Sequence, residues 1–235
     1  MQEKKRWFLR GLKDGLPVGL GYLAVSFSFG ILAHKAGLSW FQAVLMSLLN
    51  MTSAGQFAGI KTISAFGSLE ELGFSQLIIN LRYCLMSCSL SQKIDRKAPF
   101  FHRFLIAFGN TDEVFALSSA VEGPLSPYYS YGLMGMAIPG WTIGTLLGAV
   151  AGDLLPARVL SALGVALYAM FCAIIVPPAK ENKVLRAVIP LAMGASLVFA
   201  LMPLPKDIPS GLRVILLTVS ISALAAWIAP RKEEA

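Results

Sequence analysis

Four consecutive polar or acidic side chains lie in the middle of a long apolar stretch. They are Asn110, Thr111, Asp112 and Glu113, within residues 99–121. In a regular membrane-spanning helix they would fan over about 300°, because each residue turns the helix by about 100°. At least one would face lipid or an apolar neighbour, and an ionised carboxylate there costs several kcal/mol. The sequence therefore predicts a helix break near residues 109–114 that lines a wet cavity. The alternative is a loop at the membrane surface.

One basic residue, Arg82, lies equally deep in another apolar stretch, residues 74–91. Arg82 carries one positive charge and the carboxylates of Asp112 and Glu113 carry two negative charges, so one negative charge has no basic partner among these three residues. Burial favours the neutral form of a carboxylate that lacks a partner. We therefore predict that Arg82 pairs with Asp112 or Glu113, and that the other carboxylate takes up and releases a proton. A purely structural network of buried charges is the alternative.

A third polar patch, in "LLNMTSAGQFAGI" at residues 48–60, carries no charge. Its Asn, Thr, Ser and Gly residues weaken a helix, which predicts a second break at residues 50–58. The segment "TSAGQFA" (52–58) aligns without gaps on "NTDEVFA" (110–116), and both contain Phe-Ala. Interrupted helices at matching positions of a possible internal repeat point to a transport site. We expect the two breaks to meet near the middle of the membrane.

The sequence lacks enzyme and metal-site motifs, and its one match to a cofactor motif, G-x-G-x-x-A in "GLGYLA" (19–24), lacks the preceding strand that a dinucleotide site needs. It contains no H-E-x-x-H, no G-x-S-x-G and no P-loop. Cys84, Cys88 and Cys172 have neither a metal-binding spacing nor a disulfide framework. We therefore expect no enzymatic activity, no metal and no cofactor.

The composition indicates which elements position these residues. Of the 235 residues, 56% are hydrophobic and 14% are charged, and the mean hydropathy is +0.66. Soluble domains carry about 25% charged residues. Stretches of about 20 apolar residues can cross the roughly 30 Å of hydrocarbon, where a helix satisfies its own backbone. The alternating pattern of barrel strands is absent. The sequence predicts a single polytopic all-α integral membrane domain over residues 1–235.

Seven or eight transmembrane helices are expected in this domain, with broken or re-entrant helices at the two polar patches. The predicted spans are residues 15–33, 39–66, 74–91, 99–121, 128–151, 158–177, 184–203 and 211–229.

Basic residues suggest how these spans are oriented. The basic segment at residues 1–14 predicts a cytoplasmic N-terminus under the positive-inside rule. If residues 39–66 turn back instead of crossing, the basic segment 92–103 is also cytoplasmic, and we favour this arrangement. The net charge of +7 lies in such short segments and not in a patch interleaved with aromatic residues. The lipid bilayer is therefore an expected partner, and nucleic acid is not.

Four glycines recur at every fourth position of one predicted helix: Gly140, Gly144, Gly148 and Gly152. Small residues at this spacing form a flat stripe that lets a second helix approach closely. The second helix could belong to this chain or to another protein.

The chain resembles the AzlC family of branched-chain amino-acid exporters over roughly residues 10–180. The likeness rests on "GLPVGLGYLAVSFSFG", "SAGQFA", "NLRY" and "TDEVFAL". Family members more often have an Arg-His pair where this chain has Arg82-Tyr83, which leaves Asp112 and Glu113 as the candidate proton carriers. The resemblance implies a permease of the bacterial inner or cell membrane that exports leucine, isoleucine and valine. It also implies a smaller AzlD-type membrane subunit as partner, for which the glycine stripe is a candidate docking face.

Such a substrate is a zwitterion, and the backbone ends of broken helices supply groups for both of its charges. We expect an apolar surround to select the aliphatic side chain. The candidate substrate-binding residues are Ser53, Gly55, Gln56, Asn80, Thr111 and Asp112. The candidate residues for ion or proton coupling are Arg82, Asp112 and Glu113. A passive channel or a structural membrane subunit is the alternative function.

Overall fold

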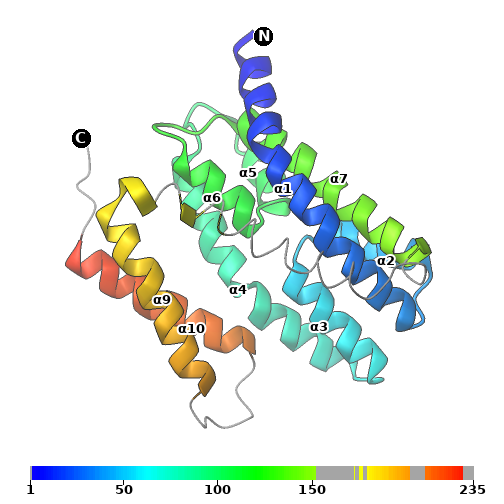
Figure 1. The fold of residues 1–235 in the computed structure, drawn as a ribbon. Helices are drawn as coiled ribbons and strands as arrows, with labels where there is room; N and C mark the ends of the chain where they lie inside the picture. The colour runs from blue at the N-terminus through cyan, green and yellow to red at the C-terminus, as the bar shows by residue number, and fades with distance from the viewer. Residues whose placement is uncertain (1, 152–171, 173–174, 177–178, 202–209, 230–235) are drawn as a thin grey trace.

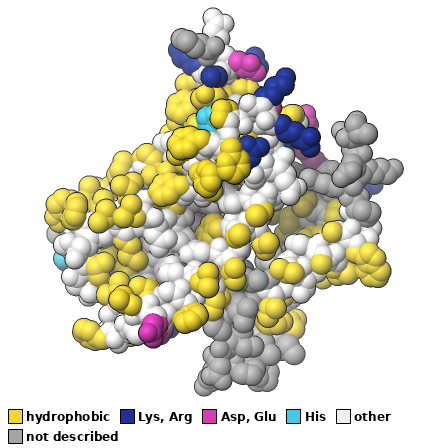
Figure 2. Space-filling model, turned by 180° about the vertical axis from the view of Figure 1, so that it is seen from behind, with side chains coloured by type: hydrophobic (Ala, Val, Ile, Leu, Met, Phe, Trp, Pro, Cys, Tyr) yellow, Lys and Arg dark blue, Asp and Glu magenta, His cyan; other side chains and the backbone are white. Residues whose placement is uncertain are grey.

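The computed structural model describes residues 2–151, 172, 175–176, 179–201 and 210–229 (Figure 1). The regular elements within these ranges are α-helices, and one β-bridge joins Ile94 to Leu125. The predicted span at residues 158–177 falls almost entirely outside the described residues. Large apolar side chains such as Leu20 and Phe104 are more than 60% exposed, as lipid-facing positions require. Figure 2 shows many such side chains on one face of the molecule.

Two long helices form the spine of the fold. Helix α1 (Gln2–Lys35) and helix α7 (Pro127–Ala151) lie side by side in Figure 1. They run parallel, since Gly11 contacts Gly132 and Gly30 contacts Ala149. Both helices are long and apolar enough to cross a membrane, by length and composition. The 34 residues of α1 extend about 51 Å, well beyond the roughly 30 Å of hydrocarbon.

Glycines allow these two helices to touch backbone to backbone. A Cβ added to Gly148 would lie 2.0 Å from the Phe27 carbonyl oxygen, and one on Gly140 would lie 2.4 Å from the Gly19 carbonyl oxygen. The predicted stripe at Gly140, Gly144 and Gly148 is thus covered by α1 of the same chain. Of the two interpretations of the stripe, packing within the chain is confirmed for these three positions, and they cannot serve as the candidate docking face because α1 already occupies them. Gly152 lies outside the described residues.

The polar patch at residues 50–58 contains a helix interruption. Helix α2 (Trp40–Leu49) begins at a capping box formed by Ser39 and Gln42, and helix α3 (Ser53–Ser64) begins after Thr52. The interruption covers only residues 50–52. It is narrower than the predicted range because the Thr52 hydroxyl accepts the Gly55 N–H and starts the next helix at once.

The second polar patch has a similar construction. Helix α5 (Phe101–Phe108) ends at Gly109, and helix α6 (Asp112–Ala120) begins after Thr111, whose hydroxyl accepts the Val114 N–H. The interruption covers residues 109–111, inside the predicted range. Thr52 and Thr111 therefore have the same N-cap role in the two patches, although the ungapped alignment of the sequence pairs Thr111 with Ser53.

The remaining described helices are α4 (Leu69–Lys93), α9 (Lys183–Leu201) and α10 (Ser210–Ile228). Helix α4 follows α3 after a short turn and is capped by Ser68. It packs against α3, α6 and α10, and α9 packs against α10.

The two interrupted pairs lie at opposite ends of the α1–α7 spine. Residues Ala43 and Ile60 of α2 and α3 pack against Ala33 and Ala149, near the C-terminal ends of α1 and α7. The start of α5 instead lies beside the N-terminal end of α1, where residues 3–7, 95–99 and 124–128 line one cavity. Segment 92–103 and the N-terminus therefore share an end of the molecule. This is the placement that a re-entrant 39–66 segment requires.

Candidate functional site

Gln56 stabilises the first helix interruption from within. Its amide nitrogen donates to the carbonyl oxygens of Asn50 (2.8 Å) and Met46 (3.1 Å). The Met46 carbonyl also accepts the Asn50 N–H at 3.0 Å, whereas the Asn50 carbonyl lies beyond the end of α2. Its amide oxygen accepts the indole N–H of Trp141 on α7 at 2.8 Å. Gln56 is fully buried, so its three hydrogen bonds replace water entirely. This side chain ties α2, α3 and α7 together.

These hydrogen bonds of Gln56 predict how much stability the protein loses when its side-chain amide is removed. Gln56→Leu leaves the Asn50 carbonyl oxygen and the buried Trp141 indole N–H without these partners, while the Met46 carbonyl keeps the Asn50 N–H. Each group left without a partner costs about 1–3 kcal/mol. We expect a loss of at least about 2 kcal/mol in the free energy of unfolding, measured by SDS titration in mixed micelles. The matched control is Gln42→Leu, which removes an exposed capping interaction worth about 1 kcal/mol. Equal stabilities of the two variants would contradict the role of Gln56.

The second interruption presents acidic groups instead. Asp112 and Glu113 occupy the first turn of α6, where the positive end of the helix dipole stabilises negative charge. Neighbouring residues on a helix point about 100° apart, so the two carboxylates face different partners.

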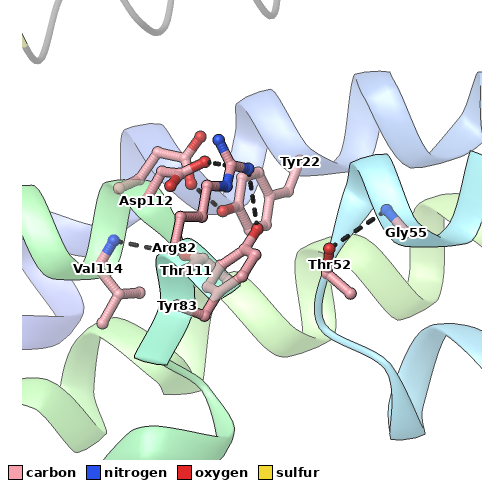
Figure 3. Close-up of polar contacts among 9 residues, drawn as sticks. Tyr22, Thr52, Gly55, Arg82, Tyr83, Thr111, Asp112 and Val114 are labelled. Carbon is pink, nitrogen blue, oxygen red and sulfur yellow. Dashed lines mark hydrogen bonds and ion pairs between the residues drawn. The ribbon is translucent and has the colours of Figure 1, made fainter. Parts of the chain in front are cut away.

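Arg82 pairs with Asp112. The Arg82 Nη2 atom lies 2.8 Å from Asp112 Oδ2 and donates to the Tyr83 hydroxyl at 3.2 Å. Figure 3 shows the guanidinium between these two side chains. The Arg82 Nε atom is buried and has no hydrogen-bond partner among the described residues. One donor of the guanidinium is therefore unsatisfied.

Glu113 has a different neighbour, Tyr22 of α1. The Tyr22 hydroxyl donates a hydrogen bond to Glu113 Oε2, and both side chains are about 95% buried. The ring of Tyr22 packs edge-on against Trp141, with ring centroids 5.2 Å apart. Glu113 is therefore the carboxylate that the arginine does not pair with.

These groups surround a central cavity of about 150 Å³. It is smaller than the roughly 300–1,000 Å³ of sites for drug-sized ligands, so it suits a small molecule. The charged and polar side is formed by α4 and α6, and the more apolar side by α1, α7 and the first interruption. The lining residues are Tyr22, Met51, Ser53, Arg82, Tyr83, Thr111, Asp112, Glu113 and Trp141.

Most of the predicted site residues meet at this cavity. Those that line it are Ser53, Arg82, Thr111, Asp112 and Glu113. Three others do not line it: Gly55, Gln56 and Asn80. The Gly55 carbonyl accepts from Gln76 and its N–H donates to Thr52, so its backbone is engaged in holding α3. The Asn80 amide donates to Gln76 at 3.4 Å.

Four lining residues were not among the predicted site residues: Tyr22, Met51, Tyr83 and Trp141. The sequence distinguishes Tyr83 only as the residue that replaces the commoner histidine next to Arg82. A signal for Trp141 was present, because the 58-residue offset that aligns the two patches also places it opposite Tyr83. No sequence signal distinguishes Tyr22 or Met51 from other apolar-helix residues.

The fold and the site define an all-helical membrane protein with a charged cavity between two interrupted helices. The family model described as AzlC protein matches residues 17–155, which is more than half of the chain. The chain belongs to the AzlC family.

Curated relatives agree with this assignment. Inner membrane protein YgaZ of Escherichia coli is 30% identical over 92% of this chain and 91% of its own length. An uncharacterized membrane protein of Archaeoglobus fulgidus is 36% identical over 79% of this chain and 82% of its own. The branched-chain amino acid transport protein AzlC of Bacillus subtilis is 22% identical over 59% of this chain and 55% of its own. No solved structure matches the chain.

Proposed function

We propose that this protein is the large subunit of a secondary transporter that exports branched-chain amino acids across the cell membrane. The observation that carries the proposal is the central cavity, which combines an arginine with an unpartnered donor, two carboxylates and an aromatic wall. The name of the Bacillus subtilis relative indicates the same substrate class. The N-terminal end of α1, with its basic residues, is then cytoplasmic.

The cavity offers a partner for each part of such a substrate. The Arg82 guanidinium and the Thr111 hydroxyl are the proposed partners of the carboxylate, and Asp112 is the proposed acceptor for the ammonium group. Met51 and Trp141 then contact the aliphatic side chain. Asp112 would exchange its bond to Arg82 for one to the substrate, which keeps both charges paired while the cavity is loaded.

Glu113 is the group we assign to proton coupling. It is nearly fully buried, lacks a basic partner among the described residues and is hydrogen-bonded to Tyr22 of α1. A change in its protonation alters the contact between α6 and the α1–α7 spine. Proton uptake at Glu113 is thereby linked to the relative position of the second interruption. This is the coupling element of the proposal.

A small AzlD-type subunit is the proposed partner. Its docking face is not the Gly140–Gly148 stripe, which α1 covers. Exposed apolar surface on α9 and α10, including Leu197 and Val219, offers other positions for a membrane partner.

Substitution of Glu113 tests the proposed coupling. We expect Glu113→Gln to retain leucine binding but to lose the dependence of export on external pH, because its side chain cannot ionise. Efflux of labelled leucine from whole cells that also express the small subunit measures this. Asp112→Asn is the matched control and should reduce the rate through weaker substrate binding. Proton coupling by these carboxylates is refuted if both variants keep pH-dependent export.

A further inference from the structure

A second cavity lies at the N-terminal end of the molecule, far from the central one. We call it the end cavity; it measures about 360 Å³, against about 150 Å³ for the central cavity. Residues from the first turns of α1, from the segment before α5 and from the start of α7 line it. The rings of Trp7 and Tyr128 form part of its wall. Figure 2 shows basic side chains gathered at this end.

Charges of both signs line the end cavity. Lys4 and Lys97 supply two ammonium groups, and Glu3 and Asp95 supply two carboxylates. No ion pair joins these four residues to one another or to other described residues. The Lys4 ammonium lies 5.2 Å from the centroid of the Tyr128 ring, and Asp95 Oδ1 accepts the Lys97 backbone N–H at 2.9 Å. The net charge of the wall is zero, yet neither sign is neutralised locally.

The end cavity lies outside the hydrocarbon. About 20 of the 34 residues of α1 suffice to cross a bilayer, and the apolar stretch of α1 begins after its basic first turns. Glu3, Lys4 and Trp7 therefore lie at the level of the lipid headgroups or beyond it, where the cavity is open to water-soluble molecules as well.

We propose that the end cavity binds a zwitterion, meaning a ligand with one ammonium group and one carboxylate or phosphate group. The two lysines bind its anionic end. Glu3, Asp95 and the aromatic rings bind its ammonium end by charge pairing and cation–π attraction. A free amino acid and the headgroup of an aminophospholipid share this chemistry. Binding of a free amino acid rests on the proposed function, since an exporter would meet its substrate at the cytoplasmic end of the molecule before the substrate reaches the central cavity.

Each of the two cavities is lined by one of the four tryptophans, which can serve as its reporter. Trp7 lines the end cavity, Trp141 lines the central cavity, and Trp40 and Trp227 are 54% and 83% exposed elsewhere. We suggest incorporating 5-fluorotryptophan into the full chain and purifying it in detergent. The protein is then titrated with leucine or phosphoethanolamine while ¹⁹F NMR spectra are recorded. Acetate and methylammonium serve as single-charge controls. Trp7→Phe assigns the Trp7 resonance.

The expected result is a saturable shift of the Trp7 resonance with a zwitterion, and a much weaker one with either single-charge ion. A response to leucine identifies a free amino acid as the ligand, and a response to phosphoethanolamine alone identifies a lipid headgroup. Lys4→Gln with Lys97→Gln should raise the half-saturating concentration about 25-fold, about fivefold for each lysine. The control pair Lys35→Gln and Lys61→Gln, at the other end of the molecule, should change nothing.

Three results would overturn the proposal: no shift with either zwitterion, equal shifts with acetate or methylammonium, or no effect of the double lysine variant. Asp112→Asn separates this test from that of the proposed function. It should abolish the response of Trp141 to leucine and leave the response of Trp7 intact.

Discussion

Arg82→Met is expected to lower the free energy of unfolding by about 3 kcal/mol and to abolish transport. The substitution leaves the Asp112 carboxylate in the cavity without its cation, and breaking a buried ion pair from one side costs about 3–5 kcal/mol. We take the lower end of this range because the two side chains are 26% and 29% exposed. SDS titration in mixed micelles measures the loss.

A double variant separates stability from function. Arg82→Met combined with Asp112→Leu removes both charges, so most of the lost stability should return while transport stays absent. Arg10→Met is the matched control, because Arg10 pairs with Asp14 at 3.6 Å on the exposed N-terminal part of α1. That pair should be worth about 1 kcal/mol or less. Transport by the double variant would contradict a role for this ion pair in substrate binding.

The contact between α1 and α7 should be the part of the fold most sensitive to added volume. Gly148→Ala places a Cβ 2.0 Å from the Phe27 carbonyl oxygen, and Gly30→Ala places one 2.2 Å from the Thr145 carbonyl oxygen. Backbone atoms cannot rotate away, so the helices must separate. Overpacking costs about 1–3 kcal/mol in ordinary cores and more where backbone is involved. We expect at least about 3 kcal/mol for each variant.

Two other glycines calibrate this prediction. Gly135→Ala would meet only the end of the Leu12 side chain at 3.3 Å, and Gly194→Ala would meet no described atom within 4 Å. The free energy of unfolding should therefore be highest for Gly194→Ala, lower for Gly135→Ala and lowest for Gly148→Ala. If Gly148→Ala does not fold, the expected result is that monodisperse protein is lost for this variant and retained for the other two. Equal stability of Gly148→Ala and Gly194→Ala would refute the close packing.

The sequence located the central site because polar groups are costly inside an apolar helix. Thr52 and Thr111 each lie in a cluster of polar residues that one uninterrupted membrane helix could not hold without cost. Both interruptions could therefore be predicted from the residue types. Their exact limits depend on which hydroxyl caps the next helix. That choice depends on local backbone geometry, which composition alone does not specify.

The partners of the charged groups required the tertiary structure. Arg82 could pair with Asp112 or Glu113 on sequence grounds alone. In the structure α4 faces Asp112, and Glu113 turns to Tyr22 of α1, a helix 91 positions earlier in the chain. The 58-residue offset singles out Trp141 in the sequence, but its place at the cavity depends on how α7 packs against both interruptions.

The glycine stripe illustrates a second limit. A regular spacing of small residues predicts close packing but does not identify the neighbour. Gly140 and Gly148 pack on α1, whose own glycines at positions 19 and 30 face α7. The glycines of α1 that fit this stripe identify the neighbour only once the structure is known.

Leucine accumulation in inside-out membrane vesicles distinguishes proton-coupled export from passive flux. Vesicles that contain this chain and its proposed small partner subunit are given labelled leucine and an imposed proton gradient. We expect leucine to accumulate above its external concentration, collapse of the gradient to abolish accumulation, and Glu113→Gln vesicles not to accumulate it. Equilibration without accumulation would indicate a passive channel, and no flux at all would indicate a structural subunit; either result would contradict proton-coupled export.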